Sequence, residues 1–592
     1  MTQDQAVVVA VLAATLGLFI WGRWRYDVVA LIALLSLVLT DIVPGETAFV
    51  GFGHPAVVTV AAVLVVSRGL QNSGMVDMLA RWLSHAGGRP TAQVASSTGL
   101  VAVLSGFMNN IGALALLMPV TIRVARAAGN RPSMLLMPLA FGSLLGGLVT
   151  LVGTPPNIVI ASFRAQSGGD PFRMFDFAPV GLGVMVAGVA FISLVGWRLI
   201  PHRDERSSDE ALFEVENYLT EVRVPADSPM VGKMVRDVGA AVEADIVIVS
   251  VLRDEERRPA PSSFERLRAG DVLTVELDTD ALQSLIDAAG LEAVGSVELP
   301  AELLGSEEIE LAEAVVMPGA RVVGRTAFGL NLRRRHGINL LAVARQGSQQ
   351  RARLGNNPLR AGDVLLLQGP AGAMAGTLAF LGCLPLAERG ISFGRPPRVL
   401  VAVLIFASAL ILAAALRLIP IQVAITAAAL VMGLAGLVSV REAYDAIDWP
   451  VIVLLGAMIP VGQALEQTGG AAKMADVLVS SGSGLPSWAI LAIVLVAAMF
   501  LSDVVNNAAA AVLMAPIAIS VAEGLEVSAD PFLMAVAIGA SAAFLTPIGH
   551  QSNILVMGPG GYRFGDYWRM GLPLEGIVAA VSVPLILIFW PL

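Results

Sequence analysis

The stretch Leu104-Ser105-Gly106-Phe107-Met108-Asn109-Asn110 recurs about 400 residues later as Leu501-Ser502-Asp503-Val504-Val505-Asn506-Asn507. Both copies begin with leucine and serine, end in paired asparagines, and precede an apolar run with a proline nine positions after the last asparagine. Burying adjacent carboxamides in apolar sequence costs free energy unless the amides find partners. Their recurrence at matched positions predicts a polar site that is built twice.

The composition is that of a polytopic membrane protein. Of 592 residues, 56% are hydrophobic and 14% charged, and the mean hydropathy is +0.75. Apolar runs near 20 residues recur, which is the length that spans a bilayer. Residues 201–392 carry 20 of the 38 Lys and Arg and 29 of the 47 Asp and Glu, which predicts a soluble insert between two membrane halves. The single cysteine, Cys383, excludes a disulfide within the chain and a thiolate metal cluster.

The two apolar halves follow one plan, which predicts an internal duplication. Pro55 matches Pro450 at an offset of 395, and Gly153 matches Gly549 at an offset of 396. The hairpin stretch repeats at an offset of 397, so the spacing stays almost constant over a hundred residues. Spanning or broken apolar segments are expected at 5–22, 27–44, 55–72, 92–128, 133–165 and 176–199, and again at 398–418, 421–438, 450–468, 487–522, 531–556 and 573–590, with amphipathic pieces at 75–88 and 470–482.

The expected fold is a polytopic α-helical membrane protein with two inverted halves. If each asparagine-bearing hairpin enters the membrane and returns, each half crosses five times, and an odd number of crossings inverts the second half. Transporters of this design hold substrate near the midplane, between interrupted segments. Basic residues place the N-terminus outside and residues 201–392 in the cytoplasm. The predicted domains are a membrane repeat at 1–200, a linker and first module at 201–300, a second module at 301–392, and the inverted repeat at 393–592.

The cytoplasmic insert is itself duplicated. The letters LRAGDVL at 267–273 return unchanged at 359–365, and Val231-Gly232-Lys233 returns as Val323-Gly324-Arg325, both at an offset of 92. Alternating β-branched runs between Gly-Asp and Pro turns predict two small α+β modules. Each resembles a TrkA C-terminal (RCK_C-type) regulatory domain, and the resemblance implies modules that pair and bind a small regulatory ligand. A dimerising scaffold without a ligand is the alternative.

The hairpin tips have a chemistry suited to ions. A re-entrant hairpin leaves backbone groups unpaired at membrane depth, where they must line a cavity or bind a ligand. Helix N-termini offer N–H groups and partial positive charge to an anion, and carbonyl and carboxamide oxygens suit sodium. The segments Gly153-Thr154-Pro155-Pro156-Asn157 and Thr546-Pro547-Ile548-Gly549-His550-Gln551-Ser552-Asn553 add a second break to each half, because proline ends a helix and frees carbonyls.

These hairpins and breaks resemble those of the divalent-anion/sodium symporter family, in the ion-transporter superfamily that includes arsenite permeases and sodium/proton antiporters. That family carries Ser-Asn-Thr at each tip, where this chain has Asn109-Asn110-Ile111 and Asn506-Asn507-Ala508. The resemblance implies one sodium site of Ser105, Asn109, Asn110 and Gly153, and another of Ser502, Asn506, Asn507, Gly549 and Thr546. It places an anion between the tips, bound by both asparagine pairs and by Thr154, Pro155, Asn157 and Asn553.

The predicted function is sodium-coupled uptake of a small divalent anion by alternating access. Hydroxyls that suit a carboxylate are missing from the tips, and asparagine-rich tips with TrkA-type modules resemble family members described as sulfate permeases, so sulfate is favoured over dicarboxylates. The resemblance further implies a homodimer in a bacterial cytoplasmic membrane, in contact with lipid, with sodium as the only metal and no tightly bound cofactor. Neither an enzymatic activity nor a nucleic-acid partner is expected.

Three alternatives remain open at this point. Asp503 has no equal in the first hairpin, where Gly106 stands, and an ionisable residue at membrane depth predicts a function, here proton or cation coupling. Asp503 therefore favours a sodium/proton antiporter or an oxyanion exporter of the arsenite type. A membrane sensor that signals through the cytoplasmic modules is the second alternative. The third is that the asparagine pairs serve only as helix caps.

Overall fold

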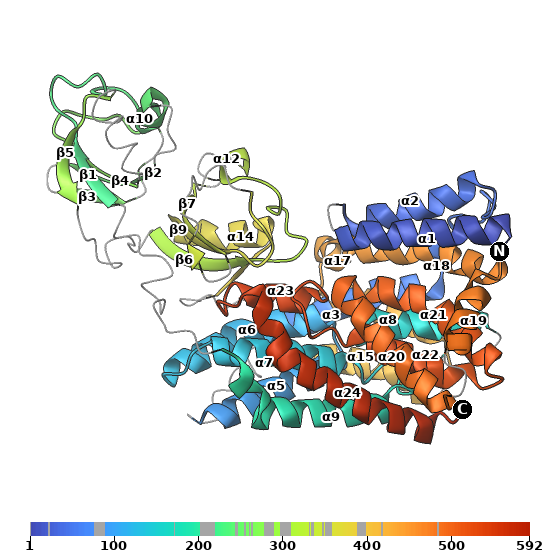
Figure 1. Ribbon diagram of the computed structural model, residues 1–592. Helices are drawn as coiled ribbons and strands as arrows, with labels where there is room; N and C mark the ends of the chain where they lie inside the picture. The colour runs from blue at the N-terminus through green and yellow to red at the C-terminus, as the bar shows by residue number, and fades with distance from the viewer. Residues whose placement is uncertain are drawn as a thin grey trace. The chain divides into compact units, whose positions relative to one another are not determined.

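The computed structural model describes residues 2–21, 24–75, 89–167, 169–170, 172–201, 219–242, 247–253, 256–259, 261, 264–276, 289–296, 309–330, 332, 337–345, 348–349, 358–386, 398–415, 418–481 and 485–592. The chain divides into a helical unit, made of Met1–Pro201, Phe393–Asn553 and Phe564–Leu592, and a second unit, made of His202–Ser392 and Ile554–Arg563. The helical unit therefore contains the first apolar half and all of the second except Ile554–Arg563, and the second unit contains the charged insert (Figure 1).

The first apolar half folds into eight named α-helices in its described residues. They are α1 (Gln3–Trp21), α2 (Tyr26–Leu39), α3 (Pro55–Leu70), α5 (Pro90–Ser105), α6 (Asn110–Ala127), α7 (Ser133–Gly147), α8 (Pro155–Gln166) and α9 (Ala178–Leu194). Prolines in the first positions of α3, α5, α8 and α9 start these helices, because the first turn needs no N–H partner. The segment expected at 133–165 is broken as predicted, into α7 and α8. All but the first residue of the expected amphipathic piece at 75–88 lies outside the described residues.

The second apolar half repeats this order with the elements α15 (Val399–Leu410), α16 (Ile421–Leu434), α17 (Val440–Ala446), α18 (Trp449–Gln467), α19 (Gly470–Ser481), α20 (Ser487–Val504), α21 (Asn507–Gly524), α22 (Ala529–Ser541), α23 (Gln551–Met557) and α24 (Tyr567–Phe589). The broken segment at 531–556 becomes α22 and α23. The last span was expected to begin at Pro573, but α24 begins six residues earlier and carries this proline inside its second turn.

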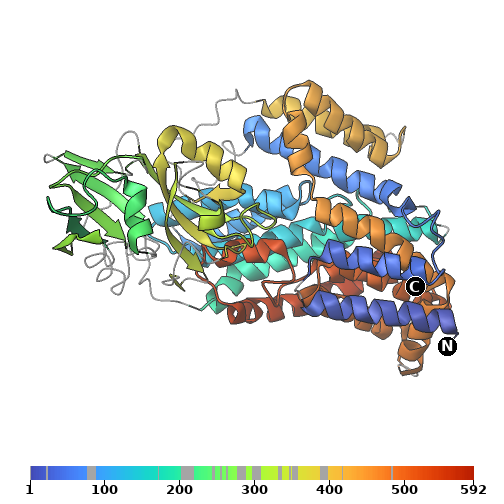
Figure 2. The same cartoon turned by 90° about the horizontal axis from the view of Figure 1, so that it is seen from above.

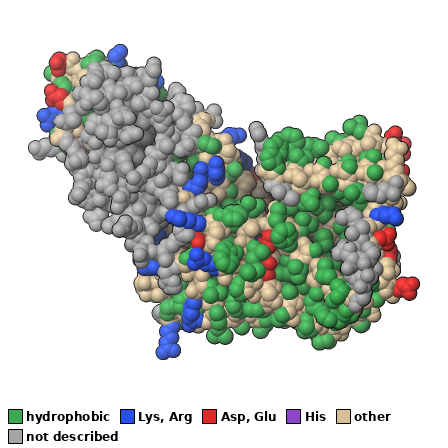
Figure 3. Space-filling model, in the orientation of Figure 1, with side chains coloured by type: hydrophobic (Ala, Val, Ile, Leu, Met, Phe, Trp, Pro, Cys, Tyr) green, Lys and Arg blue, Asp and Glu red, His purple; other side chains and the backbone are tan. Residues whose placement is uncertain are grey.

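The helical unit has the surface of a membrane protein. By length and composition, six helices of the described chain can cross a membrane, namely those that contain α3, α6, α18, α20, α21 and α24. Shorter apolar helices are formed by α1, α2, α7, α9, α15, α16 and α22. Hydrophobic side chains cover much of the visible face of this unit (Figure 3), and some are almost fully exposed, such as Leu39 at 86% and Leu434 at 80%. Contiguous apolar surface on this scale marks contact with lipid or another apolar partner.

Helices from the two halves pack side by side. The first-half helix α2 lies against α18, α3 lies against α16, and α9 lies against α24; in Figures 1 and 2 the blue N-terminal helices accordingly run beside orange ones. Within each half, α5 packs on α7 and α20 packs on α22. The helix α8, which follows the first break, packs on α21 and α22. The breaks and hairpin tips therefore lie within one packed body.

The second unit contains two five-stranded antiparallel sheets of the same topology. The first has the order β3-β2-β4-β1-β5, with β1 (Leu219–Arg223), β2 (Val247–Arg253), β3 (Glu256–Pro259), β4 (Val272–Glu276) and β5 (Glu292–Ser296). The second has the order β10-β6-β9-β7-β8, with β6 (Ile309–Val316), β7 (Asn339–Arg345), β8 (Ser348–Gln349), β9 (Val364–Pro370) and β10 (Cys383–Pro385). The helix α10 (Val235–Val242) accompanies the first sheet, and α12 (Ala327–Leu330) and α14 (Ala371–Leu381) accompany the second.

The two sheets also repeat in register. Val222 pairs with Leu273 in the first sheet and Ala314 pairs with Leu365 in the second, which preserves the sequence offset of 92. One ion pair is repeated as well: Arg253 donates to both oxygens of Asp271 at 2.8 and 2.7 Å, and Arg345 does the same to Asp363 at 2.7 and 2.7 Å. This pair ties the loop of each LRAGDVL motif to the neighbouring strand.

Candidate functional site

The first asparagine of each pair is a helix cap. Asn109 precedes α6 and its side-chain oxygen accepts the N–H of Ile111 at 3.1 Å. Asn506 precedes α21 and accepts the N–H of Ala508 at 3.0 Å, with nearly the same backbone angles. A side-chain oxygen in this position satisfies one of the free N–H groups of the first turn. The cap interpretation therefore describes one member of each pair, and a further role of Asn109 and Asn506 in ion binding stays a prediction.

The second asparagine of the first pair, Asn110, lies at the centre of a buried polar cluster. His550 Nδ1 accepts the N–H of Ser552 at 3.0 Å, so its proton sits on Nε2, which lies 3.4 Å from the Asn110 carboxamide. The amide oxygen therefore faces His550. The amide nitrogen then faces Ser105 Oγ at 2.6 Å and the carbonyls of Ser143 and Gly153 at 3.1 Å each. Ser105 and Gly153, two of the predicted sodium ligands, thus contact the amide nitrogen of the third, Asn110, which would have to turn its oxygen toward them to bind sodium. The histidine comes from the other half of the chain.

The second tip gathers its residues differently. Asn507 is buried and its oxygen accepts the Ala508 N–H at 2.8 Å, while Ser502 donates to the carbonyl of Ala540 at 2.5 Å. Thr546 donates to the carbonyl of Asp503 at 2.6 Å and accepts the N–H of Gly549 at 3.1 Å. Thr546 and Gly549 therefore lie together beside the tip, and their binding of sodium stays a prediction. His550 occupies the place of Thr154 in the second break, so the two clusters are unequal.

The asparagines of the two breaks hold equivalent carbonyls. Asn157 donates to the carbonyls of Gly147 at 3.3 Å and Thr150 at 2.8 Å. Asn553 donates to those of Ala543 at 3.0 Å and Thr546 at 3.1 Å, which are the matching positions at an offset of 396. Each amide group thereby pairs backbone acceptors that the interrupted helix leaves free. The sequence predicted only substrate binding for these two asparagines. The structure gives each of them a structural role as well, as a donor to backbone carbonyls.

Three buried oxygens at the breaks have no hydrogen-bond donor among the described residues. They are Oδ1 of Asn157, Oδ1 of Asn553 and Oγ1 of Thr154. The side chains are 0%, 0% and 1% exposed. An unpaired polar atom in such a place costs roughly 1–3 kcal/mol. The two asparagine oxygens occupy equivalent positions in the two halves, and all three oxygens lie in the breaks, where they are available as ligands to a hard cation. Pro155 follows Thr154 as the first residue of α8, which puts the free N–H groups of that helix beside them.

The structure adds one residue that the sequence analysis missed. Glu575, in α24, is 9% exposed and its Oε1 accepts the N–H of Phe544 at 3.3 Å. Asp503, 2% exposed, accepts the N–H of the next residue, Leu545, at 2.9 Å. The two carboxyl groups thus bind consecutive backbone N–H groups and lie beside each other. A signal was present in the sequence, because Glu575 is the only acidic residue within α24, and ionisable residues in spanning segments are functional candidates.

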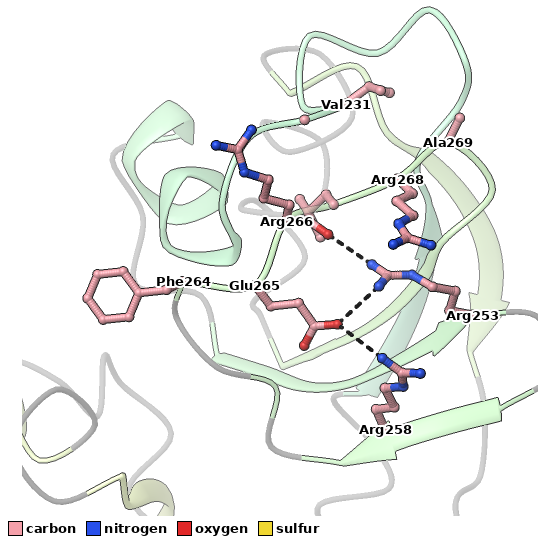
Figure 4. A pocket seen from close by; sticks show the side chains of 10 residues that line it. Val231, Arg253, Arg258, Phe264, Glu265, Arg266, Arg268 and Ala269 are labelled. Atoms are coloured by element: carbon pink, nitrogen blue, oxygen red, sulfur yellow. Dashed lines mark hydrogen bonds and ion pairs between the residues drawn. The ribbon is translucent and has the colours of Figure 1, made fainter.

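A separate pocket of about 770 Å³ lies in the first sheet module of the second unit (Figure 4). Its rim carries four arginines and one glutamate. Arg253 pairs with Glu265 at 3.3 Å, and Arg258 lies 3.9 Å from the same carboxylate. In the described part of the chain, no ion pair engages Arg266 or Arg268, which are exposed. An open pocket with this excess of positive charge suits an anion.

Apolar helices that can span a membrane, interrupted around buried polar clusters, define a membrane transporter. The chain belongs to the citrate transporter family (CitMHS), whose model matches residues 16–539 and 488–592. It is 31% identical over 586 residues to an uncharacterized transporter of Synechocystis, covering 98% of this chain and 95% of that protein. The ion-transporter superfamily predicted from the hairpins and breaks is thereby confirmed.

Two further similarities are more distant. A sodium/sulfate cotransporter of Chlamydomonas reinhardtii, its cotransporter 2, is 26% identical over 358 residues, covering 57% of this chain and 40% of that protein. The crystal structure of the YdaH transporter from Alcanivorax borkumensis aligns with a TM-score of 0.43 at 13% identity, over 95% of this chain and 90% of that one.

Proposed function

We propose that this chain is a secondary active transporter that uses a sodium gradient to take up a small divalent anion. Sulfate is the favoured substrate and a dicarboxylate the next. The similarity to a protein named as a sodium/sulfate cotransporter supports both the coupling ion and the anion. The family description supports a carboxylate substrate instead, so citrate belongs among the ligands to be tested.

The observation that carries the proposal is the equivalent construction of the two breaks. Asn157 and Asn553 bind matching carbonyls and each leaves one buried oxygen without a donor. A hard cation satisfies such oxygens without a new side chain. In the proposed arrangement one sodium lies at Ser105, Asn109, Asn110 and Gly153 with the free oxygen of Asn157. The other lies at Ser502, Asn506, Asn507, Thr546 and Gly549 with the free oxygen of Asn553, and the anion lies between them with Thr154 and Pro155.

The proposed mechanism is alternating access in an inverted repeat. Each hairpin packs on the helix that leads into its own break, α5 on α7 and α20 on α22, and this supports a unit that moves as one piece. In this scheme the N-terminus is outside, the sheet modules are cytoplasmic, and two copies of the chain form the transporter. These elements rest on the charge distribution and on the family resemblance.

Regulation through the first sheet module is part of the proposal. Its arginine-lined pocket would take a small anionic ligand. The second module supplies an internal comparison, because Gln350 and Pro358 stand at the offset of 92 where the first has Arg258 and Arg266. If the pocket binds an anion, Arg258→Gln in the full-length protein weakens that binding, and transport in the absence of the ligand stays unchanged.

Ligand-induced thermal stabilisation of purified protein tests the proposal. A ligand raises the melting temperature only if it binds the folded state, so sulfate, succinate, citrate, arsenite and phosphate are compared with and without sodium. The proposal expects an anion that stabilises only when sodium is present. Asn110→Ala and Asn507→Ala should each abolish this linkage. Asn130→Ala is the control, because Asn130 follows the far end of α6, an 18-residue helix roughly 27 Å long, and donates to Gln93. Linkage that survives in both tip variants would show that the site is elsewhere.

Deletion of residues 201–392 separates the transporter from the sensor alternative. A transporter keeps measurable flux with altered regulation, whereas a sensor loses its output.

A further inference from the structure

The LRAGDVL motif forms one loop in each sheet module, residues 267–273 in the first loop and 359–365 in the second. The two loops have the same backbone shape: Gly270 has a φ of +91° and its equivalent Gly362 a φ of +84°. Each glycine also donates its N–H to an equivalent backbone carbonyl, at 2.8 Å in the first loop and 2.9 Å in the second. A difference between the two loops therefore reflects their surroundings.

The surroundings of the two loops differ. Ala269 and Gly270 are exposed, whereas Ala361 is half-buried and Gly362 is buried. A Cβ on Gly270 would meet no atom of the described residues within 4 Å, while a Cβ on Gly362 would lie 2.7 Å from the carbonyl oxygen of Ile554. The second loop is therefore covered by a segment from near the end of the chain.

This covering segment is Ile554–Arg563, which belongs to the same compact unit as the two sheet modules. Gly558 of the segment is buried. A Cβ on Gly558 would clash with the carbonyl of Gly362 and would lie 3.2 Å from Cγ2 of Val364. Glycine allows such a close approach of two backbones because it has no Cβ. Both partners therefore carry the residue that this contact needs.

The covering segment has no counterpart in the first apolar half. At the offset of 396, Ser162 stands in place of Gly558, and it lies within the continuous helix α8. In the second half, α23 ends at Met557 and the residues Gly558-Pro559-Gly560-Gly561 follow. The N–H of Tyr562 donates to the carbonyl of Met557 at 2.9 Å and closes this turn. The two halves therefore diverge at the place where the second module docks.

The covering segment also continues directly from the second break. Ile554 follows Asn553, whose amide group donates to the carbonyls of Ala543 and Thr546. The carbonyl of Asn553 accepts a hydrogen bond from the hydroxyl of Tyr567 at 2.6 Å. Ile554 is therefore one peptide bond away from the residue that orders the break.

We propose that the second sheet module regulates transport through the contact of its loop with the covering segment. The proposal deepens the proposed function, on which its transport part rests. The second break moves in the alternating-access scheme, and a contact that holds the residues after it restrains this movement. Coupling of this kind is reciprocal, so movement of the break also acts on the module. The two modules then have different tasks: the first binds the anion in its pocket, and the second transmits the signal.

Hydrogen exchange of the purified full-length protein in lipid tests the contact without any transport assay. The two loops have the same letters and the same hydrogen bond at the glycine, so each is the control for the other. Covered backbone exchanges more slowly than exposed backbone. We expect the second loop to exchange at least tenfold more slowly than the first. Equal exchange of the two loops in wild type overturns the inference.

Two pairs of glycine substitutions separate the contact from the fold. Gly362→Ala and Gly270→Ala introduce the same left-handed alanine into the same loop, but only the first meets the covering segment. Gly362→Ala should raise the exchange of the covering segment at least fivefold, and Gly270→Ala should leave it unchanged. Gly558→Ala disturbs the contact from the other side and should raise the exchange of the second loop. Its control is Gly565→Ala, at a position where a Cβ would have no described atom within 4 Å.

Two results of these substitutions contradict the inference. One is an equal effect of Gly362→Ala and Gly270→Ala on the covering segment. The other is unchanged exchange of the second loop in Gly558→Ala, a variant that adds no left-handed alanine to either module.

Uptake of the anion into proteoliposomes then tests the regulation. Loss of the restraint should raise the initial rate at least twofold in Gly362→Ala and in Gly558→Ala, while Gly270→Ala and Gly565→Ala keep the wild-type rate. The double variant of Gly362 and Gly558 should raise the rate no further, because both substitutions remove one contact. An unchanged or lower rate in both single variants contradicts the regulation. Absence of any uptake by wild type would contradict the proposed function, while hydrogen exchange still decides whether the contact exists.

Discussion

Replacing the break asparagines by alanine is a sensitive test of the equivalence of the two halves. Asn157→Ala frees the carbonyls of Gly147 and Thr150, and Asn553→Ala frees those of Ala543 and Thr546. A buried acceptor left without its donor costs roughly 1–3 kcal/mol. Hydrogen bonds between membrane helices are worth less, about 0.6 kcal/mol on average. Between these two values, we take about 1–2 kcal/mol for each freed carbonyl. Each variant frees two carbonyls in the same geometry, so its free energy of unfolding should fall by about 2–4 kcal/mol.

Thermal unfolding of the purified variants measures this loss. With an unfolding entropy of about 2.1 cal/mol/K per residue and about 390 residues in the helical unit, the melting temperature should fall by roughly 2–5 °C. The two variants should agree within about 1 °C, since each loses two bonds of similar length. Two results would refute the equivalent structural role: a variant with the melting temperature of wild type, or two variants whose melting temperatures differ by more than the whole expected shift.

Three further predictions concern other contacts of the chain. Arg164→Ala should lower the melting temperature, because Arg164 of α8 binds both oxygens of Asp530 in α22 at 2.7 Å and a lost charged pair costs about 1.5–3 kcal/mol; unchanged melting would contradict it. Asp271→Asn and Asp363→Asn should each destabilise their own sheet module by about 3–5 kcal/mol, since each carboxylate is 1% exposed and paired with arginine, and hydrogen exchange should show the loss in one module only. Burial raises the pKa of the Cys383 thiol to about 12, so its thiolate is about a thousandfold scarcer than in an ordinary cysteine of pKa 9.0 and labelling by maleimide at neutral pH should require unfolding.

The repeated plan of the chain was predictable because it depends on local signals. Proline at helix starts, asparagine before α6 and α21, and a constant offset locate the hairpins and breaks within a few residues. The start of α24 was predicted less well. It was expected at Pro573, but a helix of membrane length tolerates this proline inside its second turn. The meeting of Ser105, Asn110 and Gly153 was also anticipated, on the basis of family resemblance.

The contacts between segments far apart in the sequence could not be predicted. His550 reaches Asn110, and Glu575 lies beside Asp503, only because the second break and α24 fold against the hairpins. Sequence spacing carries no information on such pairs. The same limit explains why substrate binding was predicted for Asn157 and Asn553. Their amide groups donate to carbonyls seven and ten residues earlier, and these carbonyls are free to accept only because the helix is interrupted.

The measurement that tests the central claim most directly is uptake of labelled sulfate into proteoliposomes that contain the full-length protein. An inward sodium gradient should drive accumulation above equilibrium, and replacing sodium by potassium on both sides should abolish it. Asn110→Ala and Asn507→Ala should remove accumulation, while Asn130→Ala should retain it. Sulfate accumulation that is indifferent to the sodium gradient, or that survives in both tip variants, would contradict the account.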